Sequence, residues 1–200
     1  MNIEFNIGGE ELDNLIQKIK IIGKIYDKYL IDSSILKNKE DIDKFSTLIN
    51  NQIKINNMKL LYRSSKDGLE LNDLKNKINN NSNLIFLFLI GNTRIFGAFI
   101  KSKIEVRDEN KIKDKDAFVF SLNNNKIYKI LIPEYAISFH NEHPLLIGNS
   151  GIGNGFWIYY GKYTQNLLKN PKIFDFQEVN ELTEGKDDFN ELEVFEINYN

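Results

Sequence analysis

Seven consecutive apolar residues, at positions 84–90, constrain the fold of this 200-residue chain more than any other stretch. The run has the length of a β-strand, and a strand that is buried on both faces carries apolar residues at every position. Periodicity alone leaves a buried helical segment as the alternative. Gly91 and Asn92 then signal a turn, and residues 94–101 are expected to return as the second strand of a hairpin.

The spacing of apolar residues along the chain changes at residues 84–90. Before this run they recur at helical spacing, which predicts helices at about residues 10–30, 40–49 and 70–78. After it, short apolar or alternating segments are separated by turns and charged loops, which predicts strands. These strands are expected at residues 104–107, 117–122, 126–132, 136–139, 156–160, 173–176 and 192–197. Because few helical stretches separate the strands, we expect an α+β, mainly β fold: an antiparallel β-sandwich of two sheets with flanking N-terminal helices.

The helical part and the β part meet at residues 59–68. The apolar stretch at residues 60–62 is strand-like and enters a polar turn at residues 63–68. Asp67-Gly68 favours a turn because Asp tolerates unusual backbone angles and Gly adopts a positive φ without steric cost.

The N-terminal segment carries an apolar stripe with heptad spacing. Its members are Leu12, Leu15, Ile19, Ile22, Tyr26 and Tyr29. Two interpretations stay open, an amphipathic helix that docks on its own domain and a coiled coil that self-associates through residues 10–30. We therefore divide the chain into an N-terminal amphipathic or coiled-coil-like helix, residues 1–31, and a second domain, residues 32–200.

Composition and charge restrict the classes of function. A net charge of −2 argues against nucleic acid as a partner, because binding phosphates needs an excess of Lys and Arg. The absence of Cys excludes disulfides and thiol chemistry and fits a reducing, cytoplasmic compartment. No apolar run reaches 18 residues, so no membrane span is expected, and the first residues lack the order of a signal peptide. Abundant Asn, Ile and Lys suggest an AT-rich genome, such as that of a protist.

Three motifs that resemble active sites lack the partners that such sites need. His140 and His143 point to opposite faces if the segment is a strand, and no third ligand is apparent, so we expect no metal site. The Gly-rich stretch at 148–155 precedes a strand-like segment and not the helix that would hold a phosphate. Ser64 and Ser65 are not surrounded by the Gly-x-Ser-x-Gly motif of a nucleophile elbow.

Two carboxylates in the last predicted strand are the stronger candidates. Glu193 and Glu196 lie on opposite faces of an otherwise apolar segment, and a buried carboxylate requires a partner. We predict that Arg63, directly after the first strand, pairs with Glu193 and so joins the first and last strands. A structural pair or an exposed edge is one interpretation, and general acid–base chemistry at Glu193 is the other.

Five stretches, in order and at compatible spacing, resemble the signatures of the TLDc domain, the module of the oxidation-resistance proteins. They are residues 60–68 (LLYRSSKDG), 95–99 (IFGAF), 116–122 (DAFVFSL), 153–158 (GNGFWI) and 191–195 (ELEVF). The likeness extends over about residues 32–197. It departs from the family where residues 143–148 lack the usual Phe and where Phe156-Trp157 replaces an acidic pair, so the contacts of a surface loop are expected to differ.

This resemblance implies a β-sandwich with flanking helices and a role in resistance to oxidative stress. Several members of the family bind the vacuolar proton-pumping (V-type) ATPase and regulate its assembly. No agreed reaction and no cofactor come with the family, so we expect a non-enzymatic interaction domain in the cytoplasm, peripheral at a membrane-bound complex. The alternatives are a scaffold that docks through its N-terminal helix and an enzyme that uses carboxylates near Glu193. The resemblance yields these candidate binding residues: Arg63, Ser64, Asp67, Gly68, Phe96, Gly97, Gly153, Gly155 and Glu193.

Overall fold

The computed structural model describes residues 13–14, 32–68, 70–107, 110–139, 145–148, 155–159, 162–165, 172–178, 181–186 and 188–200. The chain divides into two compact units, residues 1–31 and residues 32–200. In the first unit, Asp13 and Asn14 are helical. All six residues of the predicted apolar stripe lie outside the described residues, as do His140, His143 and Gly153.

Three helices flank the start of the second unit: α2 (Lys39–Asn50), α3 (Ser64–Asp67) and α4 (Leu71–Ile78). Helix α2 begins where the side chain of Asn38 accepts a hydrogen bond from the backbone N–H of Asp41. The helices predicted at residues 40–49 and 70–78 are confirmed as α2 and α4. The polar turn predicted at residues 63–68 is wrong in detail, because a single helical turn, α3, occupies most of it before Gly68, at φ 107°, ends the helix.

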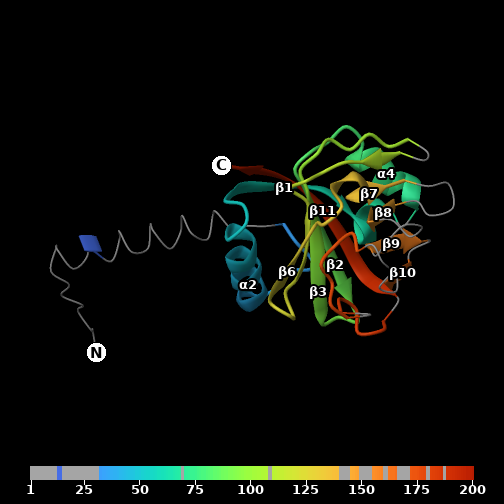
Figure 1. Cartoon of the computed structure of the whole chain (residues 1–200). Helices are drawn as coiled ribbons and strands as arrows, with labels where there is room; N and C mark the ends of the chain where they lie inside the picture. Colours follow the sequence, from blue (N-terminus) through green and yellow to red (C-terminus); the bar gives the residue numbers. More distant parts are fainter. Residues whose placement is uncertain are drawn as a thin grey trace, which may run out of the picture. The chain divides into compact units, whose positions relative to one another are not determined.

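The larger sheet contains six strands in the order β1-β11-β2-β3-β5-β6, and every neighbouring pair is antiparallel. Its strands are β1 (Ile55–Arg63), β2 (Leu84–Ile90), β3 (Arg94–Ile100), β5 (Phe118–Ser121), β6 (Lys126–Lys129) and β11 (Phe189–Tyr199). The C-terminal strand β11 lies between β1 and β2 (Figure 1), so the last strand of the chain is an interior strand of the sheet.

The second sheet contains five shorter strands in the order β10-β9-β8-β7-β4, also antiparallel. They are β4 (Lys111–Ile112), β7 (Ile137–Ser138), β8 (Leu145–Gly148), β9 (Gly155–Tyr159) and β10 (Lys162–Gln165). The two antiparallel sheets confirm the predicted fold class, an α+β, mainly β sandwich with flanking helices.

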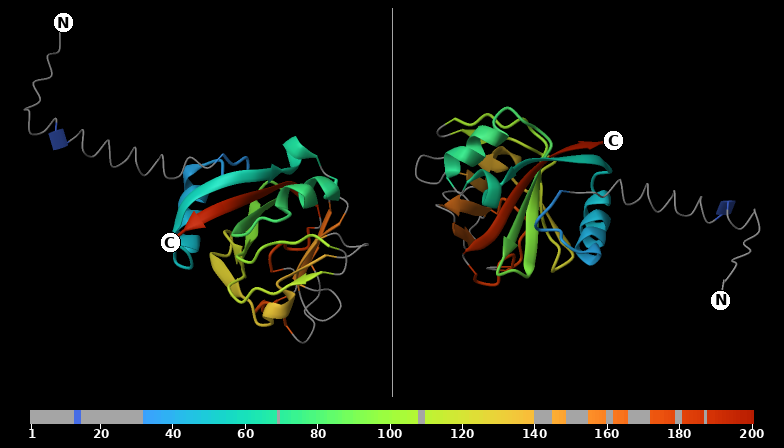
Figure 2. Two further views of the ribbon diagram at one scale, coloured as in Figure 1. Left: turned by 90° about the horizontal axis from the view of Figure 1, so that it is seen from above. Right: turned by 180° about the vertical axis from the view of Figure 1, so that it is seen from behind.

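Both faces of the six-stranded sheet are covered, which explains the unbroken apolar run in β2. Phe86 and Phe88 face the interior of the sandwich, in one buried cluster with Leu145 of β8. On the opposite face, Phe120 of β5 meets Phe45 of α2 with ring centroids 5.9 Å apart. The layers are therefore the five-stranded sheet, the six-stranded sheet and α2, as Figure 2 shows from behind. Because both faces are covered, every residue of β2 and β3 is buried.

Several predicted strand boundaries differ from the structure. Residues 104–107 are not a strand, because Ile104 exchanges backbone hydrogen bonds with Asn80 and Asn81 at the end of α4. Strands β4, β8 and β10 were not predicted, since each has at most four residues and β4 lies within a stretch of charged residues. Residues 173–176 contribute one isolated bridge, between Phe174 and Ile130, in place of a strand.

Candidate functional site

Residues from distant parts of the sequence form one row across the six-stranded sheet. In register, Arg63 of β1 is opposite Glu193 of β11, and Glu193 is opposite Leu87 of β2. Leu87 is opposite Gly97 of β3, and Gly97 is opposite Phe120 of β5. Directly opposed residues of a sheet share a face. Four of the five stretches singled out in the sequence therefore contribute to this row, on the face that α2 covers.

Gly97 occupies the centre of the row because a side chain would not fit there. A Cβ atom at this position would overlap the ring of Phe120 and the backbone carbonyl oxygen of Phe86. Without it, the Phe120 ring lies over the backbone of β3 and reaches Phe45 of α2. The glycine thus permits the packing of α2 on the sheet.

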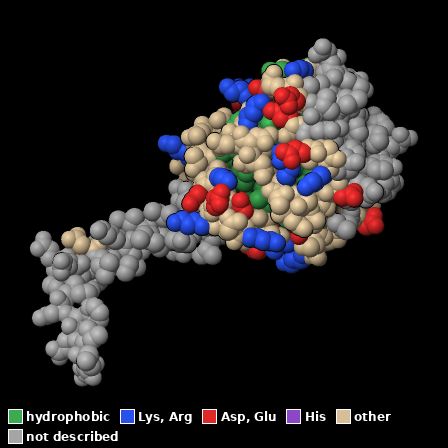
Figure 3. Space-filling model, turned by 90° about the horizontal axis from the view of Figure 1, so that it is seen from below, with side chains coloured by type: hydrophobic (Ala, Val, Ile, Leu, Met, Phe, Trp, Pro, Cys, Tyr) green, Lys and Arg blue, Asp and Glu red, His purple; other side chains and the backbone are tan. Residues whose placement is uncertain are grey.

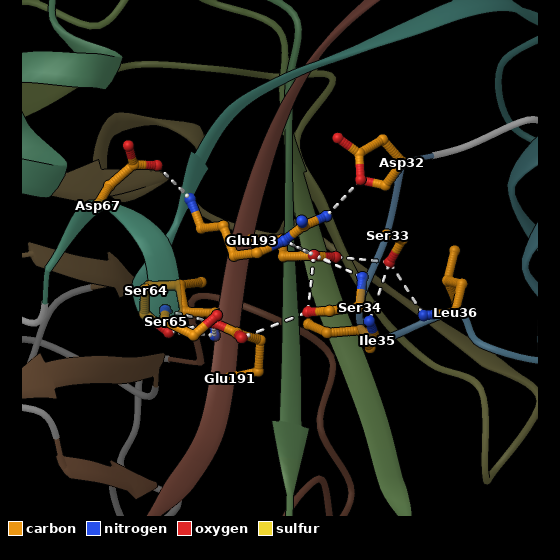
Figure 4. A network of polar contacts seen from close by, with 12 residues as sticks. Asp32, Ser33, Ser34, Ile35, Leu36, Ser64, Ser65, Asp67, Glu191 and Glu193 are labelled. Atoms are coloured by element: carbon orange, nitrogen blue, oxygen red, sulfur yellow. Dashed lines mark hydrogen bonds and ion pairs between the residues drawn. The ribbon is translucent and has the colours of Figure 1, made fainter.

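Glu193 is completely buried and accepts four hydrogen bonds (Figure 4). Its Oε1 atom accepts from Arg63 Nε at 2.6 Å. The same oxygen accepts from the backbone N–H of Ser34 at 2.7 Å and from Ser34 Oγ at 3.0 Å. Its Oε2 atom accepts from Ser33 Oγ at 2.5 Å. The predicted pair of Arg63 and Glu193 is confirmed, and it joins the first and last strands.

Arg63 connects this carboxylate to the beginning of the second unit. Its Nη2 atom donates to the backbone oxygen of Asp32 at 2.7 Å and to Asp32 Oδ1 at 2.9 Å. Burial disfavours the charged guanidinium, but hydrogen bonds to Asp32 and Glu193 outweigh it and raise the pKa of Arg63. The backbone N–H of Arg63 donates to Asp67 Oδ2 at 2.9 Å, which lowers the pKa of Asp67, and Lys77 adds to that effect.

Glu191 is a second buried carboxylate, two residues along the same strand. Its Oε1 atom accepts from Ser64 Oγ and, at 3.0 Å, from the backbone N–H of Ser65 at the start of α3. Its Oε2 atom lies 3.3 Å from Ser34 Oγ. Burial would raise the pKa of Glu191, but the hydrogen bonds from Ser64 and Ser65 outweigh it and lower that pKa.

Residues 32–36, here called the strap, are the element that the sequence did not reveal. Ser33 Oγ donates to Glu193 and accepts from the backbone N–H groups of Ile35 and Leu36, at 3.1 and 2.9 Å. Ile35 and Leu36 are buried, with 2% and 3% of their surface exposed. A Ser-Ser pair followed by two apolar residues is the available signal, since Ser side chains bond backbone groups two or three positions on.

The geometry fits a structural anchor better than a reacting group. Glu193 has no exposed surface, and its four hydrogen-bond donors all belong to the chain itself. A general base must come within hydrogen-bond reach of its substrate, and a carboxylate with no exposed surface does not. Among the described residues, no group of three His, Asp or Glu side chains could hold a metal ion.

The remaining candidate residues lie around this cluster or outside it. Gly68 accepts a hydrogen bond from Tyr62 Oη at 2.7 Å through its backbone oxygen. Phe96 stacks on Phe88 with centroids 5.1 Å apart in the sandwich interior, away from the row. Gly155 begins β9 in the other sheet. Glu196 lies 3.9 Å from Lys59 in a partly exposed cross-strand pair.

Comparison with known proteins identifies a family. The family model of the TLDc domain matches residues 30–198. No curated protein matches the chain. The matched span begins just before the strap and ends in β11, so it contains the whole row, the strap and both buried carboxylates.

Proposed function

Because the chain belongs to the TLDc domain family, we propose that residues 32–200 form a non-enzymatic protein-interaction domain that binds a V-type proton-pumping ATPase. Regulation of that pump, within resistance to oxidative stress, is its proposed role. The family match over residues 30–198 carries this proposal. We also propose that the candidate binding residues named from the sequence contribute to this interaction.

The state of the two buried carboxylates supports a binding role over a catalytic one. Glu193 is buried and bonded to Arg63 and the strap, and Glu191 is bonded to Ser64 and Ser65. Both carboxylates therefore bind groups of the chain itself. The pair therefore stabilises the scaffold on which an interaction surface is carried.

The surface supports a protein partner. On the face drawn in Figure 3, Lys and Arg side chains are interspersed with Asp and Glu side chains. Such a mixture lacks the single-sign field that favours nucleic acid. In the described part of the chain, no helix is long and apolar enough to cross a membrane. We place the protein in the cytoplasm, at the periphery of the membrane-bound pump.

Affinity capture from native membranes tests this proposal. The tagged full chain is incubated with a mild-detergent extract of acidic organelles from cells that make the protein, and the bound proteins are identified by mass spectrometry. We expect ATPase subunits to be enriched, and we expect the added chain to change ATP hydrolysis by the same membranes. The chain with Gly97→Phe, which cannot pack Phe120, is the control for recovery by unfolded protein. Recovery of other partners without ATPase subunits would contradict the proposal.

Self-association through residues 10–30 remains a separate proposal, supported by the heptad stripe of the sequence. Light scattering of the full chain and of residues 32–200 distinguishes it from docking on the same chain. A larger than monomeric mass that falls to monomer without residues 1–31 is expected for a scaffold. A monomeric mass for the full chain would exclude it.

A further inference from the structure

Every polar contact between the strap and the described part of the sheet involves the side chain of Arg63, Glu191 or Glu193. Asp32 binds Arg63, and Ser33 and Ser34 bind Glu193. Among the described residues, no backbone–backbone hydrogen bond joins the strap to a strand. The strap is therefore a segment that can open locally while the sheets stay intact.

Ser34 lies between two buried negative charges. Its Oγ atom is 3.0 Å from Glu193 Oε1 and 3.3 Å from Glu191 Oε2. A hydroxyl carries one proton and can donate to one of these oxygens at a time. Of these two carboxylates, Glu193 is bonded to Arg63, which it shares with Asp32. A hydrogen-bond donor at the hydroxyl position is stabilised by the two carboxylates, whereas an added negative charge would be repelled by them.

We propose that Ser34 is a phosphorylation site whose modification releases the strap. A protein kinase would transfer the γ-phosphoryl group of a nucleoside triphosphate to Ser34 Oγ. The new Oγ–P bond replaces the bond between the γ-phosphorus and the β,γ-bridging oxygen, the nucleoside diphosphate leaves, and the hydroxyl proton passes to the kinase base. The product carries about −1.5 to −2 charge and has lost the hydroxyl donor. Placed against Glu191 and Glu193, this group is repelled and the strap detaches.

The position of the strap makes Ser34 accessible to a kinase and determines what release of the strap would change. Ser34 is partly exposed, the neighbouring Asp32 and Lys37 are exposed, and the segment is irregular. The strap directly follows the boundary between the two compact units, at residues 31 and 32. Its release would add five residues to the connection between them, or about 17 Å of extended chain. Phosphorylation would thus change the reach of the first unit, which goes beyond binding of an ATPase.

Limited proteolysis of the full chain tests the release. Phosphoserine is installed at position 34 by genetic encoding, with phosphoserine at Ser82, in the loop before β2, as the matched control. Trypsin cleavage after Lys37 is followed by mass spectrometry. We expect the rate to rise about tenfold or more with phosphoserine at 34, because hydrogen bonds to charged groups are lost, and to stay unchanged with phosphoserine at 82. Cleavage after Lys59 in β1 reports global unfolding and should not change.

Three outcomes would overturn the proposal. An unchanged or slower cleavage after Lys37 would mean that Arg63 captures the phosphate and holds the strap. A Ser34→Ala chain that is cleaved as fast as the phosphorylated chain would show that the lost hydroxyl, and not the added charge, opens the strap. Phosphopeptide mapping of the native protein completes the test: phosphate on Ser34 supports the assignment, and its absence under all growth conditions refutes it as a natural site.

Discussion

Replacing Glu193 with Gln is the change that distinguishes a structural anchor from a catalytic group. The substitution keeps the size of the side chain but removes its charge and turns one acceptor oxygen into an amide donor. At least one of the four donors, Arg63 Nε, the Ser33 hydroxyl or the two groups of Ser34, then loses its acceptor. A buried site with no exposed surface offers no water in exchange.

The expected loss of stability is about 2–4 kcal/mol. A lost hydrogen bond to a charged group costs about 1.5–3 kcal/mol. Breaking a buried ion pair costs about 3–5 kcal/mol when the remaining charge has no partner. Arg63 keeps Asp32, so the upper end of that range does not apply. For a domain of this size, the expected change is a fall in Tm of about 5–15 °C.

Urea unfolding followed by circular dichroism measures this change, and the same two strands supply the control. Glu196 pairs with Lys59 at 3.9 Å, but 35% and 71% of the two side chains are exposed. Glu196→Gln should therefore alter stability by less than about 0.5 kcal/mol. If Glu193→Gln were equally mild, Glu193 would not be an anchor. Unchanged stability together with loss of an enzymatic activity would favour the catalytic alternative.

Three further changes test the packing and the electrostatics. Gly97→Ala should lower the free energy of unfolding, measured in urea, by about 1–3 kcal/mol, because its methyl group overlaps the Phe86 carbonyl oxygen and the Phe120 ring. The control Asn57→Ala, at an exposed position of β1, should have little effect. Phe45→Ala should cost about 3–5 kcal/mol and speed amide exchange in α2, since the ring is 1% exposed against Phe120. The folded-state pKa of Glu191 lies below its ordinary value of 4.5, so its contribution to stability is present above that pH and is lost as pH falls through the folded-state pKa. The urea midpoint of Glu191→Gln should therefore fall less than that of the wild type between about pH 5 and pH 3.

The sequence was most informative where burial is complete. Residues 84–90 predict a strand correctly because both faces of β2 are covered, which leaves no polar position to obscure the run. The pairing of Arg63 with Glu193 was also predictable, since a carboxylate in an apolar strand needs a cation. Opposite charges act directly on each other only within about 6 Å. Arg63 Nε and Glu193 Oε1 lie 2.6 Å apart, well inside that range.

The sequence was least informative where few residues or non-local contacts decide the structure. Strands of two to four residues, such as β4, β8 and β10, are too short for an alternating pattern to appear. Glu191 lies on the same face as Glu193 by its spacing of two, but its partners Ser64 and Ser34 are more than 120 positions away. No local pattern specifies such contacts, which depend on β11 lying between β1 and β2.

Hydrogen exchange at the amide of Ser34 tests the anchoring of the strap most directly. This N–H donates to Glu193 Oε1 at 2.7 Å, a contact between residues 159 positions apart. In the unphosphorylated full chain, we expect its exchange to be slowed at least about a hundredfold relative to an unstructured peptide, though less than in β2, because local opening frees it. Exchange of Ser34 within about threefold of the unstructured rate, with β2 fully protected, would show that Glu193 does not hold the strap.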